Sequence, residues 1–182
     1  TTSASITWDS AGTWNMNTPD TAGDNRMMRG YLDSGGELGN ATVTVAGITF
    51  EAYDVLVYFD GDNQGAWKVA NYTVDGTTLG GEDSEDTDFG AGGQNTNGVF
   101  QVPQGGPNGN QPYPQTPNNN EGNVVVFADM TGPTFSMVSS ASSRAPINGI
   151  QIVQVLVPEP STLALVGLGL AGLVAARRRR TR

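Results

Sequence analysis

Short stretches of alternating apolar and polar residues run through the first 156 residues, and this period of two is typical of β-strands. Residues 41–46 place Val43 and Val45 on one face of such a strand. Residues 53–59 are apolar on both faces after their first two positions, which predicts a central strand covered on both sides. Further strands are expected at residues 5–8, 27–32, 98–102, 124–128, 134–138 and 147–155.

Turn-forming residues separate these stretches. Asp75-Gly76 suits the two positive-φ positions of a type I′ turn, so residues 66–74 and 77–79 are predicted to form a hairpin. A turn-rich segment and an acidic loop are expected at residues 9–25 and 81–93.

The same pattern predicts the fold class. Residues 1–156 show no sustained apolar period of 3.6, so the pattern predicts no amphipathic helix there. Many short strands with turns between them favour an all-β fold: a single antiparallel β-sandwich, jelly-roll-like, of about eight to ten strands. Residues 103–123 are rich in Pro, Gly, Asn and Gln and are expected to form a long loop within this domain.

The last 26 residues, 157–182, follow a different pattern. An apolar stretch at 161–176 is followed by the basic residues of 177–182, and its uncharged core of 14 residues would form a helix of about 21 Å. A bilayer core measures about 30 Å, so the flanking residues and a snorkelling arginine are needed to complete the span. We therefore expect one short C-terminal transmembrane helix. The positive charges that stop it in the cytoplasm are Arg177, Arg178, Arg179 and Arg180.

The order Pro-Glu-Pro, short Gly/Leu/Ala helix and terminal Arg cluster resembles the PEP-CTERM sorting tail of bacterial surface proteins. The resemblance implies that an exosortase-type membrane transpeptidase recognises this tail, removes the helix and passes the protein to the cell surface or its polysaccharide matrix. The residues of the recognition motif would be Val157, Pro158, Glu159 and Pro160. An ordinary membrane anchor is the alternative. No signal peptide is visible at the N-terminus, but a protein destined for this C-terminal signal must cross the membrane. We therefore expect that a signal peptide has been removed before Thr1.

Composition narrows the possible chemistry. The chain has no Cys and no His, which excludes thiol nucleophiles, serine-histidine triads and ordinary zinc sites. Its net charge of −9 conceals a body in which 17 acidic residues outnumber four basic ones up to residue 157, a net of −13. Such a body repels phosphate backbones, so nucleic acid is not an expected partner, whereas cations and neutral polysaccharide remain.

Two acidic segments are candidates for a calcium site. Asp60, Asp62 and Gln64 follow a predicted strand at alternate positions, as at the start of a D-x-D-x-[DN]-G calcium loop. Asp86 and Asp88 belong to a segment with five carboxylates in seven residues, whose mutual repulsion a divalent cation would relieve. A polar hairpin loop and a solvated acidic loop are the alternatives for the two segments.

Aromatic side chains are the candidates for carbohydrate stacking. Trp67 is the preferred one because it follows the polar loop at the start of a predicted strand, while Trp8, Trp14 and Tyr113 are further candidates. Packing in the core or at its rim is the alternative for each of them.

The body also resembles the galactose-binding-like and malectin-like β-sandwiches. Residues 53–60 and the closing segment 144–152 carry this resemblance, which implies a final strand that returns beside the first.

Taken together, the sequence predicts an exported, non-enzymatic protein of the surface or extracellular matrix. It would be anchored in the membrane by its C-terminal helix, then processed by an exosortase and associated with extracellular polysaccharide in a biofilm. A calcium-assisted carbohydrate-binding domain is the second hypothesis, and a polysaccharide hydrolase that uses two carboxylates is the third.

Overall fold

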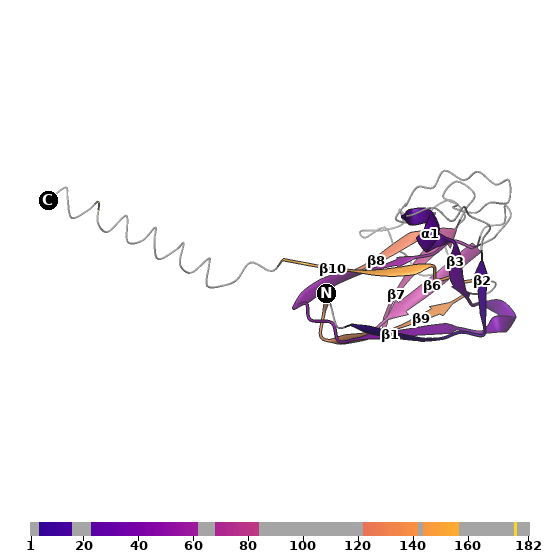
Figure 1. Ribbon diagram of the computed structural model, residues 1–182, viewed down its shortest axis with the longest axis horizontal. Coiled ribbons are helices and arrows are strands. Elements are labelled where there is room, and N and C mark those ends of the chain that lie inside the picture. Colours follow the sequence, from indigo (N-terminus) through magenta and orange to yellow (C-terminus); the bar gives the residue numbers. More distant parts are fainter. Residues whose placement is uncertain are drawn as a thin grey trace.

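The computed structural model describes residues 4–15, 23–61, 68–83, 122–141, 144–156 and 177. These residues form two antiparallel sheets that pack face to face, with a small two-stranded sheet at one end (Figure 1). The strands are β1 (Ser5–Asp9), β2 (Gly12–Asn15), β3 (Gly30–Asp33), β4 (Ala41–Ala46), β5 (Ala52–Tyr58), β6 (Lys68–Val74), β7 (Thr77–Asp83), β8 (Val124–Thr131), β9 (Thr134–Ser140) and β10 (Gly149–Gln154). The helical elements are the α-helix α1 (Asp24–Met28) and the 3₁₀ turn η1 (Gly36–Leu38).

The strand order identifies the type of sandwich. The larger sheet has the order β1-β4-β9-β6-β7, the smaller one β10-β5-β8, and β2 pairs with β3. From β4 to β10 the chain passes from one large sheet to the other at every connection except the β6–β7 hairpin. This alternation is typical of jelly rolls, so the predicted antiparallel all-β sandwich is confirmed.

The core lies between the two sheets. Val43 and Val45 of β4 are buried and face the smaller sheet, while the threonines between them are exposed, as the alternation predicts. Val55 and Val57 of β5 are completely buried, and β5 is the central strand of its sheet, which confirms the prediction for residues 53–59. The other strands add Ala70, Tyr72, Val74, Val125, Phe127, Phe135 and Met137 to the same cluster. Each large apolar side chain buried in this way contributes about 1.5–3 kcal/mol, so this layer is the main source of stability.

The predicted hairpin is also confirmed. Asp75 has φ 45° and Gly76 has φ 87°, and Val74 pairs with Thr77 across the turn. The second strand is longer than predicted, because β7 continues to Asp83. The first three residues of the expected acidic loop, 81–83, therefore belong to a strand, and residues 84–93 lie outside the described part of the chain.

The N-terminal region differs most from the prediction. Residues 24–28, part of which was expected to be a strand, form α1, which begins with hydrogen bonds from the N–H groups of Arg26 and Met27 to the Gly23 carbonyl. A five-residue helix is too short to show an apolar period. In addition, β2 lies within the segment expected to contain only turns, because β2 is stabilised by pairing with β3 rather than by burial.

The last strand does not return beside the first, in contrast to what the second resemblance implies. β10 pairs with β5, whereas β1 pairs with β4, so the first and last strands belong to opposite sheets. Ile147, expected to begin the last strand, instead forms an isolated bridge with Leu32. The predicted strand at 98–102, almost all of the predicted loop at 103–123 and the predicted helix at 161–176 lie outside the described residues.

Candidate functional site

The sandwich is open along the side where β1 and β10 lie. Each is the edge strand of its own sheet at that side. Ile6 stands opposite Val45 and Trp8 opposite Val43, so both side chains continue the inner face of the larger sheet. They are nevertheless 52% and 60% exposed, since the narrower three-stranded sheet does not cover them. The open side therefore presents the inner, apolar face of the sandwich to solvent.

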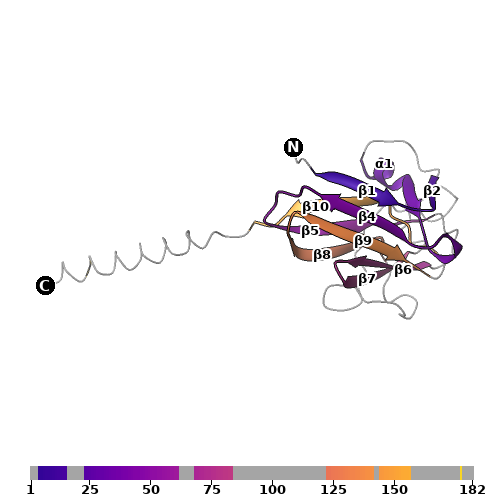
Figure 2. The same ribbon diagram turned by 90° about the horizontal axis from the view of Figure 1, so that it is seen from below.

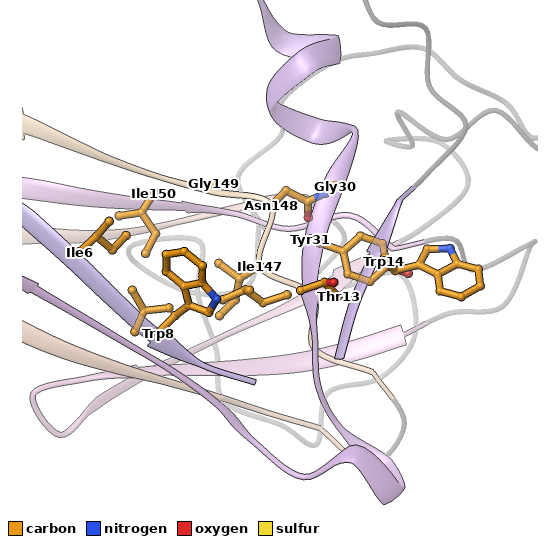
Figure 3. A pocket seen from close by; sticks show the side chains of 12 residues that line it. Ile6, Trp8, Thr13, Trp14, Gly30, Tyr31, Ile147, Asn148, Gly149 and Ile150 are labelled. Carbon is orange, nitrogen blue, oxygen red and sulfur yellow. The ribbon is translucent and has the colours of Figure 1, made fainter. Parts of the chain in front are cut away.

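A cleft of about 370 Å³ occupies this opening. Ile6 and Trp8 line it from β1, Trp14 and Tyr31 from the two-stranded sheet, and Ile147 and Ile150 from the segment that carries β10 (Figure 3). This volume falls within the range of about 300–1,000 Å³ that is usual for small-molecule sites.

Two tryptophans give the cleft its aromatic character. Trp14 of β2 stands opposite Tyr31 of β3 and is 52% exposed, so a large part of its indole ring remains accessible. In Figure 3 the ring of Trp8 lies near the isoleucines, and that of Trp14 lies beyond Tyr31. The two indoles therefore lie on either side of Tyr31.

The wall formed by Tyr31 is held from behind. Tyr31 is 4% exposed, and its hydroxyl oxygen accepts a hydrogen bond of 3.0 Å from Nη1 of Arg144, whose guanidinium carbon lies 5.9 Å from the ring centroid. Arg144 in turn forms an ion pair with the nearly buried Asp33, with 3.5 Å between Nε and Oδ1. Among the described residues, none of those that line the cleft is charged. The charged side chains of Arg144 and Asp33 thus hold Tyr31 in place without lining the cleft themselves.

Asn148 forms the polar part of the same wall. Its Nδ2 donates to the Met28 carbonyl at 3.0 Å, and its Oδ1 accepts from the Asp60 N–H at 2.7 Å. Both ends of this amide are engaged within the protein, so its role at the cleft is to join α1 to the end of β5.

The structure places Asp60 inside the domain. Its side chain is completely buried directly after β5, next to the chain at Asn123, whose carbonyl oxygen accepts from the Phe59 N–H. The other predicted calcium ligands, Asp62, Gln64, Asp86 and Asp88, lie outside the described residues. Within the described residues, no group of three or more acidic side chains gathers in a way that could hold a metal ion. Calcium at the Asp60 loop stays a prediction.

The preferred stacking residue, Trp67, and the further candidate Tyr113 also lie outside the described residues. The structure instead brings together Trp8 and Trp14, which the sequence named only as further candidates. The available signal was the alternation of Ile6 and Trp8 in the first strand, which assigns both to the inner face.

The C-terminal tail follows closely after β10. Its motif residues 157–160 and predicted helix lie outside the described part, in which Arg177 is helical and exposed. No helix among the described residues is long and apolar enough to cross a membrane.

Comparison with known proteins identifies the C-terminal segment alone. Residues 156–180 match the PEP-CTERM protein-sorting motif. The chain therefore carries the signal of an exported surface protein that an exosortase processes, and the sorting motif predicted from its tail is confirmed. No curated protein and no solved structure matches the chain.

Proposed function

We propose that this protein is a non-enzymatic component of the bacterial cell surface or extracellular matrix, in which the β-sandwich is the binding module. The observation that carries the proposal is the sorting motif at residues 156–180, which begins two residues after β10 ends. A domain in this position is delivered to the outer side of the membrane and displayed there or passed on to the matrix.

The open cleft supports a neutral carbohydrate as the ligand. Exposed indole rings stack on the apolar C–H faces of sugar rings, and Trp8 and Trp14 offer two such surfaces, each with an N–H donor. The uncharged lining lies in a body of net charge −13, which repels acidic ligands and leaves neutral ones. A neutral extracellular polysaccharide combines these properties.

Binding without catalysis is favoured by the residue types available. The chain contains no His and no Cys, so proton transfer would have to rely on carboxylates. Hydrolysis of a glycosidic bond ordinarily requires two carboxyl groups that flank it at about 5–9.5 Å from each other. No described residue that lines the cleft carries a carboxyl group, which supports a binding role for it.

Mutation of the sorting motif tests the first part of the proposal. Replacing Pro158, Glu159 and Pro160 together by Ala removes the recognition motif, and we expect the full-length protein to accumulate in the membrane fraction. Replacing Pro112, Pro114 and Glu121 by Ala is a matched control, because it also removes two Pro and one Glu and leaves the tail intact. Normal release of the motif variant would contradict processing through this signal.

Tryptophan fluorescence tests the second part. The chain has only three tryptophans, so in a Trp67→Phe background every emitting indole lines the cleft. We expect purified neutral matrix polysaccharide to shift or quench this emission, and the variants Trp8→Ala and Trp14→Ala each to weaken binding about tenfold. Unchanged emission upon saturation, or unchanged affinity in the Trp8→Ala, Trp14→Ala double variant, would reject the cleft as the site.

A further inference from the structure

β1 is an edge strand whose outer side is not paired by any strand in the described part of the chain. Figure 2 shows it at the border of the five-stranded sheet, next to β4 and at the opposite side from β7. Its five residues are all exposed. An edge of this kind presents a row of backbone N–H and C=O groups that can pair with another strand.

The two edges of the larger sheet differ in their protection against such pairing. β7 ends in Glu82 and Asp83, and contacts β8 of the opposite sheet, which closes the sandwich on that side. β1 contains no Pro and no Lys, the residues that commonly block edge pairing, and its single charge is Asp9 at its end. Within the described part of the larger sheet, β1 is therefore the edge that is open to a partner.

We propose that two copies of this protein associate through antiparallel pairing of their β1 strands, which joins the two five-stranded sheets into one continuous sheet. A two-fold axis at Thr7 would set the register. Ile6 then stands opposite the partner's Trp8, and Trp8 opposite the partner's Ile6, so an aliphatic and an aromatic side chain meet twice on the inner face. The sequence Ser5–Asp9 is thus complementary to itself in this register.

The single charged residue of β1 allows a second copy of the chain to pair in this register. Asp9 stands opposite the partner's Ser5, whose hydroxyl is a hydrogen-bond donor, and no two carboxylates face each other. The remaining electrostatic cost is the mutual repulsion of two bodies that each carry a net charge of −13. Salt screens repulsion of this kind over a Debye length of about 10 Å at 0.1 M, so association should strengthen with added salt.

The size of the contact sets its strength. Five residues from each copy bury less than the about 800 Å² per partner of a standard interface. The pair is therefore weak in dilute solution and forms when copies are held close together. Display at a surface raises the effective concentration to the millimolar range, where weak contacts are occupied.

Substitutions that place a positive or a negative charge at position 7 provide the test, because the two-fold axis places Thr7 opposite Thr7 of the second copy. Self-association of the full chain in nonionic detergent is measured by sedimentation over a range of concentrations. We expect Thr7→Lys to weaken it about fivefold or more, since two lysines then oppose each other, and Thr7→Glu to act likewise. An equimolar mixture of the two variants should associate at least as well as the unmodified chain.

Thr42→Lys is the matched control. Thr42 is exposed on the neighbouring strand β4, opposite Asp9, so the variant adds the same charge one strand away from the edge. Equal self-association of all variants would overturn the proposal, because it is the result expected if the C-terminal tail causes the association. A mixture of Thr7→Lys and Thr7→Glu that associates no more strongly than either variant alone would also overturn it. All these variants retain Trp8 and Trp14, and association is measured without polysaccharide, so a failure of carbohydrate binding at the cleft would not change the outcome.

Discussion

Asn148 accepts a hydrogen bond from the backbone N–H of Asp60 across 88 positions of sequence, at 2.7 Å. The same amide donates to the Met28 carbonyl at 3.0 Å, and the Asn148 N–H donates to the Tyr58 carbonyl at 2.9 Å. One residue before β10 thus joins the end of β5 to the short helix α1, and holds one wall of the cleft.

Asn148→Ala should destabilise the domain by about 2–3 kcal/mol, because it leaves the Asp60 N–H and the Met28 carbonyl without their side-chain partner. Urea unfolding of the full chain measures the change. Asn148→Asp is the informative companion, since it keeps the acceptor for Asp60 and loses the donor to Met28. Ala loses both contacts and Asp only one, so a smaller loss is expected for Asp. A loss at least as large as that of Ala would mean that repulsion between the new carboxylate and the Met28 carbonyl outweighs the retained contact.

Gly81→Ala should also destabilise the domain, through overpacking. A Cβ at position 81 would overlap the ring of Phe59, which is completely buried and also packs on Tyr72 with 5.0 Å between ring centroids. The expected cost is about 1–3 kcal/mol. Gly12→Ala is a suitable control, because its added methyl group would meet Asp33 Cβ at an ordinary 3.8 Å. Recovery of stability in a Gly81→Ala, Phe59→Leu double variant would identify the ring as the cause.

Removal of the hydroxyl group should change the stability of the domain differently at two buried tyrosines. The Tyr72 hydroxyl donates to the Pro146 carbonyl at 2.7 Å, whereas the buried Tyr53 hydroxyl has no hydrogen-bond partner among the described residues. Tyr72→Phe should therefore cost about 1–2 kcal/mol, and Tyr53→Phe should be neutral or stabilising. Thermal melting of both variants, each differing from the parent by one oxygen atom, gives a direct comparison.

Stability should fall at alkaline pH. Burial, with a smaller contribution from Asp75, raises the pKa of Tyr53 above the ordinary 10.0, and burial together with Asp24 raises the pKa of Tyr58. Between the ordinary and the raised pKa the folded state retains protons that the unfolded state has lost, so the free energy of unfolding decreases as the pH rises above about 10. Denaturant midpoints from pH 8 to 11 measure this decrease. A Tyr53→Phe, Tyr58→Phe variant should show a smaller decrease, and an identical slope would assign the effect to other groups.

Alternation in the sequence predicted those parts of the fold where burial decides the conformation. Val43, Val45 and the residues of β5 were assigned correctly because one face or both faces of their strands are covered. Asp75-Gly76 was equally informative, since its backbone dihedral angles are a local property. β8 was predicted to end at Ala128 but reaches Thr131. Its full length could not be predicted from the pattern because its last residues are largely exposed.

The cleft was not predictable from local pattern. Its position depends on how far the smaller sheet extends over the larger one, which follows from strand order and not from any single segment. The alternation of Ile6 and Trp8 assigned both side chains to an inner face, but it could not show that this face is uncovered. Similarly, the sequence around Asp60 predicted a calcium loop or a polar hairpin loop, and neither pattern could show that Asp60 is buried or that its N–H donates to Asn148, 88 positions away.

The pairing of β10 with β5 has a consequence for the order of events at the membrane. The Val155 N–H still donates to the Ala52 carbonyl at 2.9 Å, so the folded domain holds the chain up to this residue. Only three residue steps separate Val155 from Pro158, which span at most about 11 Å when fully extended. A processing enzyme must therefore either accept a folded sandwich within about one nanometre of its active site, or cut before the final strand has joined its sheet. In both cases the timing of the last folding step and the timing of release are physically linked.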